Sequence, residues 1–170
     1  MSLTFAILTV SDRSAAGTRE DLSGPALREA VVRAGWTVSA TAIIPDELQQ
    51  ISDNLITWAD SDEFHIILTT GGTGFSPRDV TPEATESIID RQAPGLAEAM
   101  RAGSLKITAH AMLSRAAAGI RKNTLIVNLP GSPKGALENF RIVAPVLPHA
   151  VQLLINDDRA EAGHRPGRAV

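Results

Sequence analysis

A glycine-rich turn follows a strongly apolar run near the middle of the chain. The run spans Phe64 to Leu68, and three of the four residues 71–74 are glycine. Because glycine has no Cβ atom, this backbone can adopt positive φ angles and let a ligand approach its amides. A strand, a glycine turn and a helix start present backbone N–H groups to phosphate. The spacing favours a phosphate-binding loop, with a plain strand-to-helix turn as the alternative.

Two aspartates are spaced to hold a metal beside that phosphate. Asp79 lies just past the glycine turn, and Thr81 is the expected N-cap of a helix that continues with Pro82. Asp46 follows another apolar run, and Gln49 stands at capping-box spacing from it, so capping a helix is its alternative role. Mg²⁺ binds one or two carboxylates together with phosphate oxygens. The pair of acids therefore suits a magnesium site.

Two more polar loops follow expected strands. One contains Ser11, Asp12 and Arg13, and the other runs from 128 to 133. Ligands of open parallel sheets bind beyond the carboxyl ends of the strands. We therefore expect these loops, the Asp46 loop and the glycine turn to share one site. Generic nucleotide motifs do not identify it, because the turn lacks a Walker A ending and a third glycine at Rossmann spacing.

Strands and helices alternate along the chain and must position these loops. The apolar patterns predict strands over 3–10, 36–44, 64–69 and 124–129, and helices that begin near 25, 48, 82, 94 and 133. Residues 116–119 resemble a short helix end, and Pro145 and Pro148 should kink or split the last helix. This order predicts an α/β fold, a three-layer αβα sandwich with a mostly parallel sheet and helices on both faces.

The length and composition favour one globular domain. The chain has 170 residues, of which 44% are hydrophobic and 21% charged. We expect a single domain over residues 1–156. The charged and small residues of 157–170 predict a C-terminal tail that is mobile or docked on a partner.

Charge and residue usage exclude several function classes. A net charge of −3 argues against a sequence-independent nucleic-acid binder, and 4% aromatic residues argue against a base-stacking platform. The absence of cysteine excludes disulfides and thiolate metal sites, and it fits a reducing compartment. The apolar run Leu3–Val10 is too short for a membrane span and lacks a signal-peptide layout. We therefore expect a cytoplasmic protein without membrane contact.

The region from 104 to 122 carries polar side chains with weak periodicity. They are Ser104, Ser114, Arg115, Arg121 and Lys122. A solvated surface is their simplest role, and their residue types alone give no reason to reject it.

Several stretches together resemble the MogA/MoaB family of molybdenum cofactor biosynthesis. The glycine turn and the stretch Pro-Arg-Asp-Val-Thr-Pro-Glu-Ala-Thr at 77–85 carry the resemblance most strongly. Supporting stretches lie at 8–13, 44–46, 111–116 and 128–133, so that the resemblance covers about residues 4–155. Residues 94–96 and 111–115 favour the MogA-like adenylyltransferase branch, which includes the plant Cnx and gephyrin G domains.

The resemblance implies a molybdopterin adenylyltransferase, which transfers AMP from ATP to molybdopterin with Mg²⁺ and releases pyrophosphate. Asp46 and Asp79 would be the essential acids that position Mg²⁺ and the phosphates. The implied nucleotide-binding residues are Ser11, Asp12, Arg13, Gly71, Gly72, Thr73, Gly74, Pro130 and Gly131. The implied molybdopterin-binding residues are Ser104, Ser114, Arg121, Lys122 and Asn128.

The resemblance also implies a homotrimer, with transient contact to molybdopterin synthase or a molybdenum-inserting protein. Nucleotidyl transfer needs positioning and charge neutralisation more than a covalent nucleophile, which agrees with a chain that has glycine amides and acids but no cysteine. Two alternatives stay open. One is a sister-branch protein that binds molybdopterin or nucleotide without catalysis, and the other is a scaffold module.

Overall fold

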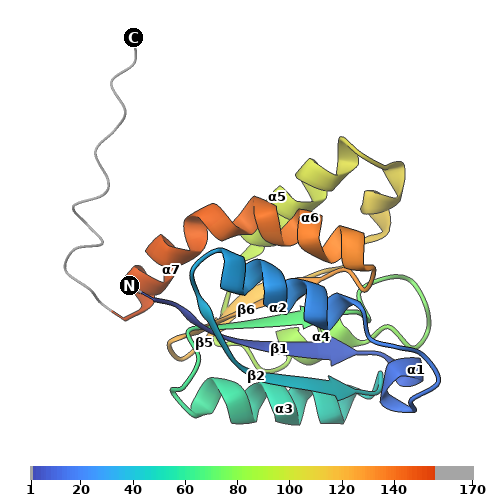
Figure 1. Ribbon diagram of the computed structural model, residues 1–170, viewed down its shortest axis with the longest axis horizontal. Helices are drawn as coiled ribbons and strands as arrows, with labels where there is room; N and C mark the ends of the chain where they lie inside the picture. Colours follow the sequence, from blue (N-terminus) through green and yellow to red (C-terminus); the bar gives the residue numbers. More distant parts are fainter. Residues whose placement is uncertain (1, 156–170) are drawn as a thin grey trace.

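The computed structural model describes residues 2–155, which form a six-stranded sheet between two layers of helices (Figure 1). The strands are β1 (Thr4–Val10), β2 (Thr37–Ile44), β3 (Ile66–Thr70), β4 (Arg91–Gln92), β5 (Ala118–Arg121) and β6 (Thr124–Leu129). The α-helices are α1 (Asp12–Ala15), α2 (Ser23–Arg33), α3 (Leu48–Asp60), α4 (Thr81–Glu86), α5 (Pro94–Leu105), α6 (Pro133–Val143) and α7 (Leu147–Leu154). Two 3₁₀ segments complete the set, η1 (Ala109–Leu113) and η2 (Ala144–Val146).

The sheet has the strand order β2-β1-β3-β6-β5-β4. The pairs β1–β2, β1–β3 and β3–β6 are parallel, so four strands end at the same edge. The pairs β5–β6 and β4–β5 are antiparallel. The expected α/β class with a mostly parallel, doubly covered sheet is confirmed.

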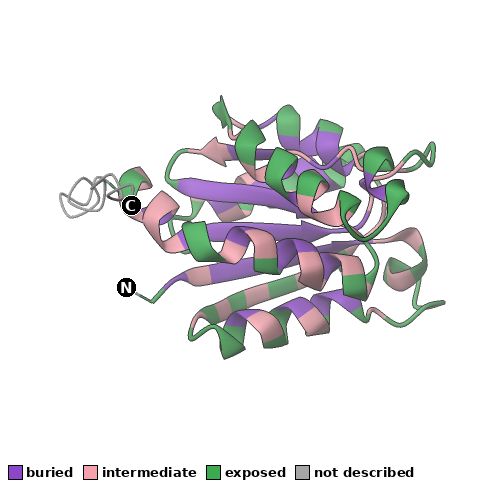
Figure 2. Ribbon diagram, turned by 90° about the horizontal axis from the view of Figure 1, so that it is seen from above, coloured by how far each residue is buried: buried purple, intermediate pink, exposed green. Residues whose placement is uncertain are grey.

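Alternate side chains of the buried strands enter two separate cores. Phe5 and Ile7 pack on one face with α2, α5, α6 and α7, whereas Ala6 and Leu8 pack on the other with α3 and α4. This alternation follows from the period of two in a strand. Figure 2 shows the buried strands between the two partly exposed helix layers. The two cores hold the sheet rigid and therefore fix the positions of the loops at its edge.

Some helix caps and ends lie where the sequence predicts them, and others do not. Ser132 caps α6 by accepting a hydrogen bond from the Gly135 amide, and the prolines divide the last helical stretch into α6, η2 and α7. The helix end expected at 116–119 is wrong, because residues 118–121 form β5 and return along β6 through a turn in which Lys122 has φ 50°. Thr81 does not cap α4 but is its first residue.

Within residues 2–155, no helix combines the length and apolar character that a membrane crossing requires. The expected tail at 157–170, and the boundary at residue 156, lie outside the described residues.

Candidate active site

Four loops leave the sheet where the parallel strands end. They follow Val10, Ile44, Thr70 and Leu129. Backbone hydrogen bonds tie neighbouring loops together, from the Ser11 amide to the Ile44 carbonyl at 2.9 Å and from the Gly71 amide to the Leu129 carbonyl at 3.2 Å. The loops predicted to share a site therefore do lie side by side.

The glycine turn packs backbone against backbone. Gly71 has φ 102°, and a Cβ atom there would overlap the carbonyl oxygen of Val10. A Cβ on Gly131 would lie 3.1 Å from the Cα of Gly71. Gly72 also has positive φ, at 63°, and a Cβ there would lie 2.9 Å from Oδ1 of Asp46. Only glycine at these positions lets the three strand ends come so close.

A cavity of about 580 Å³ opens in front of this turn. It contains Asp46 and Asp79, the two acids that the sequence singled out. Ser132, which caps α6, borders it from the end of β6. Six of the nine predicted nucleotide-binding residues line this cavity, namely Ser11, Asp12, Arg13, Gly71, Gly72 and Gly131.

Asp46 points back to the loop after β1 rather than into α3. Its Oδ2 accepts a hydrogen bond from the Asp12 amide at 2.9 Å. The N-cap of α3 is Glu47, which makes no side-chain capping bond, so the capping role considered for Asp46 is wrong. Burial raises the pKa of Asp46, and the nearby charges of Asp12 and Asp79 also act to raise it. These neighbours place Asp46 where a cation would be favoured.

Asp79 is held at the far side of the same turn. Its Oδ2 accepts a hydrogen bond from the Ser76 amide at 2.9 Å, and a Cβ on Gly74 would lie 2.9 Å from that oxygen. The carboxylate is therefore folded back over the glycine turn, which explains why the turn and the acid occur five residues apart.

Arg78 closes the outer side of this cavity. Its Nε and Nη2 donate to the two carboxylate oxygens of Asp12 at 3.0 and 2.9 Å, and Nη2 also donates to Glu47 at 2.8 Å. The hydrogen bond from Arg78 is the main reason that the pKa of Asp12 lies below its ordinary value. One arginine thus links the loops that follow β1, β2 and β3. The sequence pattern gave it no role, although it stands directly before Asp79.

The two acids fit a magnesium ion. Within residues 2–155, Oδ1 of Asp46 and of Asp79 accepts no hydrogen bond from the chain, and both side chains line the cavity. The described residues contain no group of three or more His, Cys, Asp or Glu able to hold a metal. A metal here would take its remaining oxygen ligands from water and from phosphate, which is the usual coordination of Mg²⁺.

A second cavity of about 280 Å³ lies on the other side of the glycine turn. Ser104 and Ser114, two of the residues predicted to bind molybdopterin, line it. Ser132 lines both cavities, so they adjoin at the start of α6. Three residues predicted to bind nucleotide face this second cavity instead of the first, namely Thr73, Gly74 and Pro130.

A family model described as a probable molybdopterin binding domain matches residues 6–149. The chain belongs to this family. The match covers most of the two cores and all four loops of the site, and the expected resemblance to MogA and MoaB proteins is confirmed by the relatives.

Relatives of this chain include proteins of similar length and much longer proteins. A molybdopterin adenylyltransferase of Helicobacter pylori is 40% identical over 160 residues, which are 92% of this chain and 90% of that protein. The molybdenum cofactor synthesis protein cinnamon of Drosophila melanogaster is 46% identical over 92% of this chain, but the chain spans only 26% of its length. The solved structure of MoaB from Thermus thermophilus has a TM-score of 0.86 and 49% identity, and it covers 91% of this chain and 98% of its own.

Three residues predicted to bind molybdopterin do not line the second cavity. Asn128 is fully buried, and its side chain is bonded to Thr69, Thr85 and the Ala117 amide, so it holds the sheet instead of a ligand. Arg121 is the last residue of β5, which runs back to the edge where β6 starts, and Lys122 follows it in the turn. They lie at the edge of the sheet opposite the cavities.

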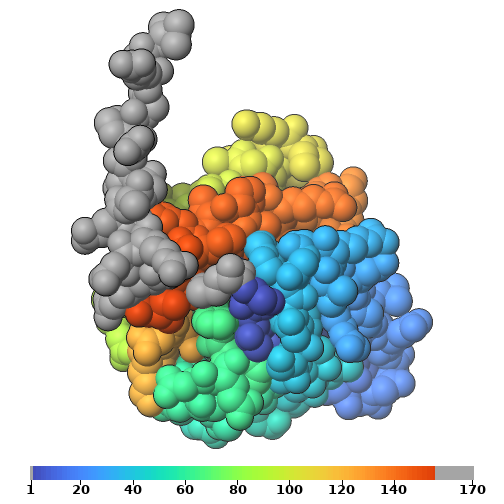
Figure 3. All heavy atoms as spheres, turned by 60° about the vertical axis from the view of Figure 1, so that its left-hand side comes forward, coloured from blue at the N-terminus to red at the C-terminus, as the bar shows by residue number. Residues whose placement is uncertain are grey.

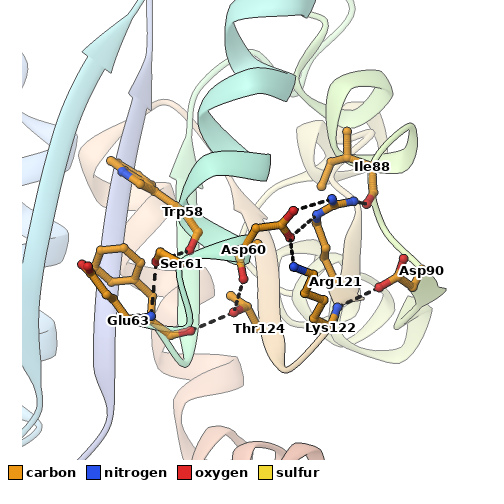
Figure 4. A network of polar contacts seen from close by, with 11 residues as sticks. Trp58, Asp60, Ser61, Glu63, Ile88, Asp90, Arg121, Lys122 and Thr124 are labelled. Carbon is orange, nitrogen blue, oxygen red and sulfur yellow. Dashed lines mark hydrogen bonds and ion pairs between the residues drawn. The ribbon is translucent and has the colours of Figure 1, made fainter.

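Figure 4 shows what Arg121 and Lys122 do at that edge. Arg121 donates twice to Asp60 at the end of α3, at 2.8 Å each, and once to the Ile88 carbonyl. Lys122 pairs with the same Asp60 at 3.2 Å, and its amide donates to Asp90. The two cations therefore hold α3 against the β5–β6 hairpin. Figure 3 views the molecule from this side, where the start of the chain lies next to the green segment that leads into β3.

Proposed function

We propose that this chain is a molybdopterin adenylyltransferase that transfers AMP from ATP to molybdopterin. The observation that carries the proposal is the pair of adjoining cavities, one lined by Asp46 and Asp79 and the other by Ser104 and Ser114, separated by the glycine turn. The names of relatives such as the Helicobacter pylori adenylyltransferase support it. Two cavities that share Ser132 suit a reaction between two bound substrates.

The chemistry is a displacement at phosphorus. A phosphate oxygen of molybdopterin attacks the α-phosphorus of ATP, the bond from that phosphorus to the oxygen bridging to the β-phosphate breaks, and pyrophosphate leaves. Such a transfer depends on alignment of the two substrates and on neutralisation of charge on the phosphate oxygens. In this proposal ATP occupies the cavity of Asp46 and Asp79, and molybdopterin occupies the cavity of Ser104 and Ser114.

The backbone of the chain would align the nucleotide, and its acids would hold the ion that neutralises phosphate charge. The Gly72 amide would face the nucleotide phosphates, whereas the Gly71 amide is already bonded to the Leu129 carbonyl. Asp46 and Asp79 would hold Mg²⁺ through their free Oδ1 atoms. A bound Mg²⁺ would neutralise charge that develops on the phosphate oxygens and on the departing pyrophosphate.

A homotrimer and a cytoplasmic location are further parts of the proposal. The trimer is testable by sedimentation velocity at several protein concentrations, where a monomer at all of them would contradict it. The cytoplasmic location is consistent with a chain that contains no cysteine. Contact with molybdopterin synthase or a molybdenum-inserting protein would be transient.

Calorimetric titration of ATP with Mg²⁺, followed by an assay of pyrophosphate release with molybdopterin, tests the function. We expect ATP to bind in the presence of Mg²⁺ and pyrophosphate to appear only when molybdopterin is added. Binding without release would favour a non-catalytic sister-branch protein. Failure of both ligands to bind would contradict the proposal and leave a scaffold as the better interpretation.

A further inference from the structure

Arg115 grips the loop that carries Asp79. Its Nε donates to the Gly74 carbonyl at 2.7 Å, and its Nη2 donates to the Asp79 carbonyl at 2.6 Å. Its Nη1 pairs with Glu83 in the first turn of α4. Partial burial acts to raise the pKa of Glu83, but the hydrogen bond from Arg115 brings that pKa below its ordinary value. One planar guanidinium therefore contacts the loop at both ends and the helix that follows it.

These contacts fix the distance between the two ends of the loop, Gly74 and Asp79. A guanidinium has a rigid fork of donors, so two carbonyl oxygens bonded to it are held at a set separation. The Asp79 carboxylate is already tied to the Ser76 amide within the same loop. With its backbone carbonyl also held, Asp79 has little freedom to move away from the first cavity.

Arg115 makes these contacts from outside both cavities. Neither cavity is lined by Arg115 itself, but Ser114, the residue before it, lines the second one. The Arg115 amide donates to the carbonyl of Thr73 at 2.9 Å, and Thr73 also lines the second cavity. The same residue thus connects the wall of one cavity to the acid of the other.

We propose that Arg115 is a positioning residue that sets the Asp79 carboxylate for metal and nucleotide and links it to the second cavity. The inference rests on the proposed function, since it assumes that Asp79 holds Mg²⁺ with a nucleotide. Groups that orient the direct ligands of a metal often change its affinity by about 10- to 100-fold when they are removed. Arg115 stands in that relation to Asp79.

The test is the Mg²⁺ dependence of ATP binding, measured by titration calorimetry on wild type and Arg115→Lys. Lysine keeps the charge but cannot bond both carbonyls and Glu83 at once. We expect the Mg²⁺ concentration for half-maximal ATP binding to rise about tenfold, with little change in the weak binding measured in EDTA. Arg33→Lys, at an exposed arginine that pairs with Glu29, is the matched control and should keep the wild-type Mg²⁺ requirement.

A purely structural role would give a different result. It would lower the melting temperature and weaken ATP binding equally with and without Mg²⁺, and this outcome would overturn the inference. An unchanged Mg²⁺ requirement in a folded Arg115→Lys protein would overturn it as well. Failure of the wild type to bind ATP would overturn the proposed function together with the inference, whereas the previous outcomes concern Arg115 alone.

Glu83→Gln provides the second variant, in case Arg115→Lys shows no cooperative thermal transition. This change removes the charged partner of Arg115 and leaves both carbonyl bonds in place. We expect a smaller rise in the Mg²⁺ requirement, about two- to fivefold, because the guanidinium keeps its position less firmly. A folded Glu83→Gln protein with the wild-type requirement would contradict the role of Arg115.

Discussion

Asp12 and Asp46 exchange hydrogen bonds across the ends of β1 and β2. The Asp12 amide donates to Oδ2 of Asp46 at 2.9 Å, and the Asp46 amide donates to Oδ1 of Asp12 at 3.0 Å. Arg78 holds the same Asp12 carboxylate from the loop after β3. Side-chain contacts therefore tie the loops after β1, β2 and β3 to one another, and the cavity keeps its shape before any ligand arrives.

Asp79→Asn is the most direct test of the metal role. Asparagine keeps an oxygen for the Ser76 amide and loses the charge, so the fold should persist. We expect pyrophosphate release to fall at least about a hundredfold, because charge neutralisation in the transition state is lost. Rates and a thermal melt measured on the same preparation separate the two effects. Activity within a few-fold of wild type would show that Asp79 does not hold the metal.

The raised pKa of Asp46 predicts how the free energy of unfolding depends on pH. Its folded pKa is raised above the ordinary value of 3.8, so between 3.8 and the raised pKa the folded state binds more protons than the unfolded state. This contribution to the free energy of unfolding therefore declines as pH rises through that window, and it is level above it. Asp46→Asn removes the penalty, so the variant should match or exceed wild-type stability at neutral pH.

Urea unfolding of wild type and Asp46→Asn at a series of pH values measures this difference. The variant should gain relative to wild type as pH rises from 3.8 and then keep a constant lead. We also expect pyrophosphate release to drop about a hundredfold, since the charged form is the one that binds a cation. A variant that loses stability at neutral pH would contradict the penalty assigned to the carboxylate.

Two glycine substitutions should have opposite effects on stability. Gly71→Ala forces a Cβ into the Val10 carbonyl at φ 102°, and we expect a loss of about 3 kcal/mol in the free energy of unfolding. Gly95→Ala places a Cβ in open space on α5, where alanine favours the helix by up to about 1 kcal/mol. Chemical denaturation of both variants checks the pair, and equal effects would contradict the strain assigned to Gly71.

Arg121→Lys tests whether Arg121 stabilises the fold and does not bind molybdopterin. Lysine cannot keep the two bonds to Asp60 together with the bond to the Ile88 carbonyl, so the melting temperature should fall. Adenylyl transfer should stay within about twofold of wild type, because the residue lies away from both cavities. A large rise in the KM for molybdopterin would show instead that Arg121 reaches a substrate.

Much of the fold could be predicted because its signals are local. The apolar run at 64–69 and the cap at Ser132 each act within a few residues. The direction of β5 could not be predicted in this way, since it depends on pairing with β6 and not on the composition of 116–119. The two-residue turn at 122–123 before a clear strand was the available signal for a hairpin.

The same difference between local and long-range signals explains which site residues could be predicted from the sequence. Asp46 and Asp79 could be placed because parallel strands deliver their following loops to one edge. Asn128 lies within β6, one residue before its end, and its orientation into the core depends on partners on β3 and α4 that are distant in sequence. Arg78 and Arg115 were not assigned roles because each acts on loops 30 or more residues away, through contacts that only the folded chain creates.

The tight packing of Gly71 against Val10 and of Gly131 against Gly71 limits how this protein can be redesigned. Random mutagenesis at these glycines would mostly yield destabilised variants, whatever ligand is sought. Arg13, Arg19 and Ser76 also border the first cavity, yet they are exposed on the surface. A library that seeks a different nucleotide preference should vary those three positions and leave the glycines untouched.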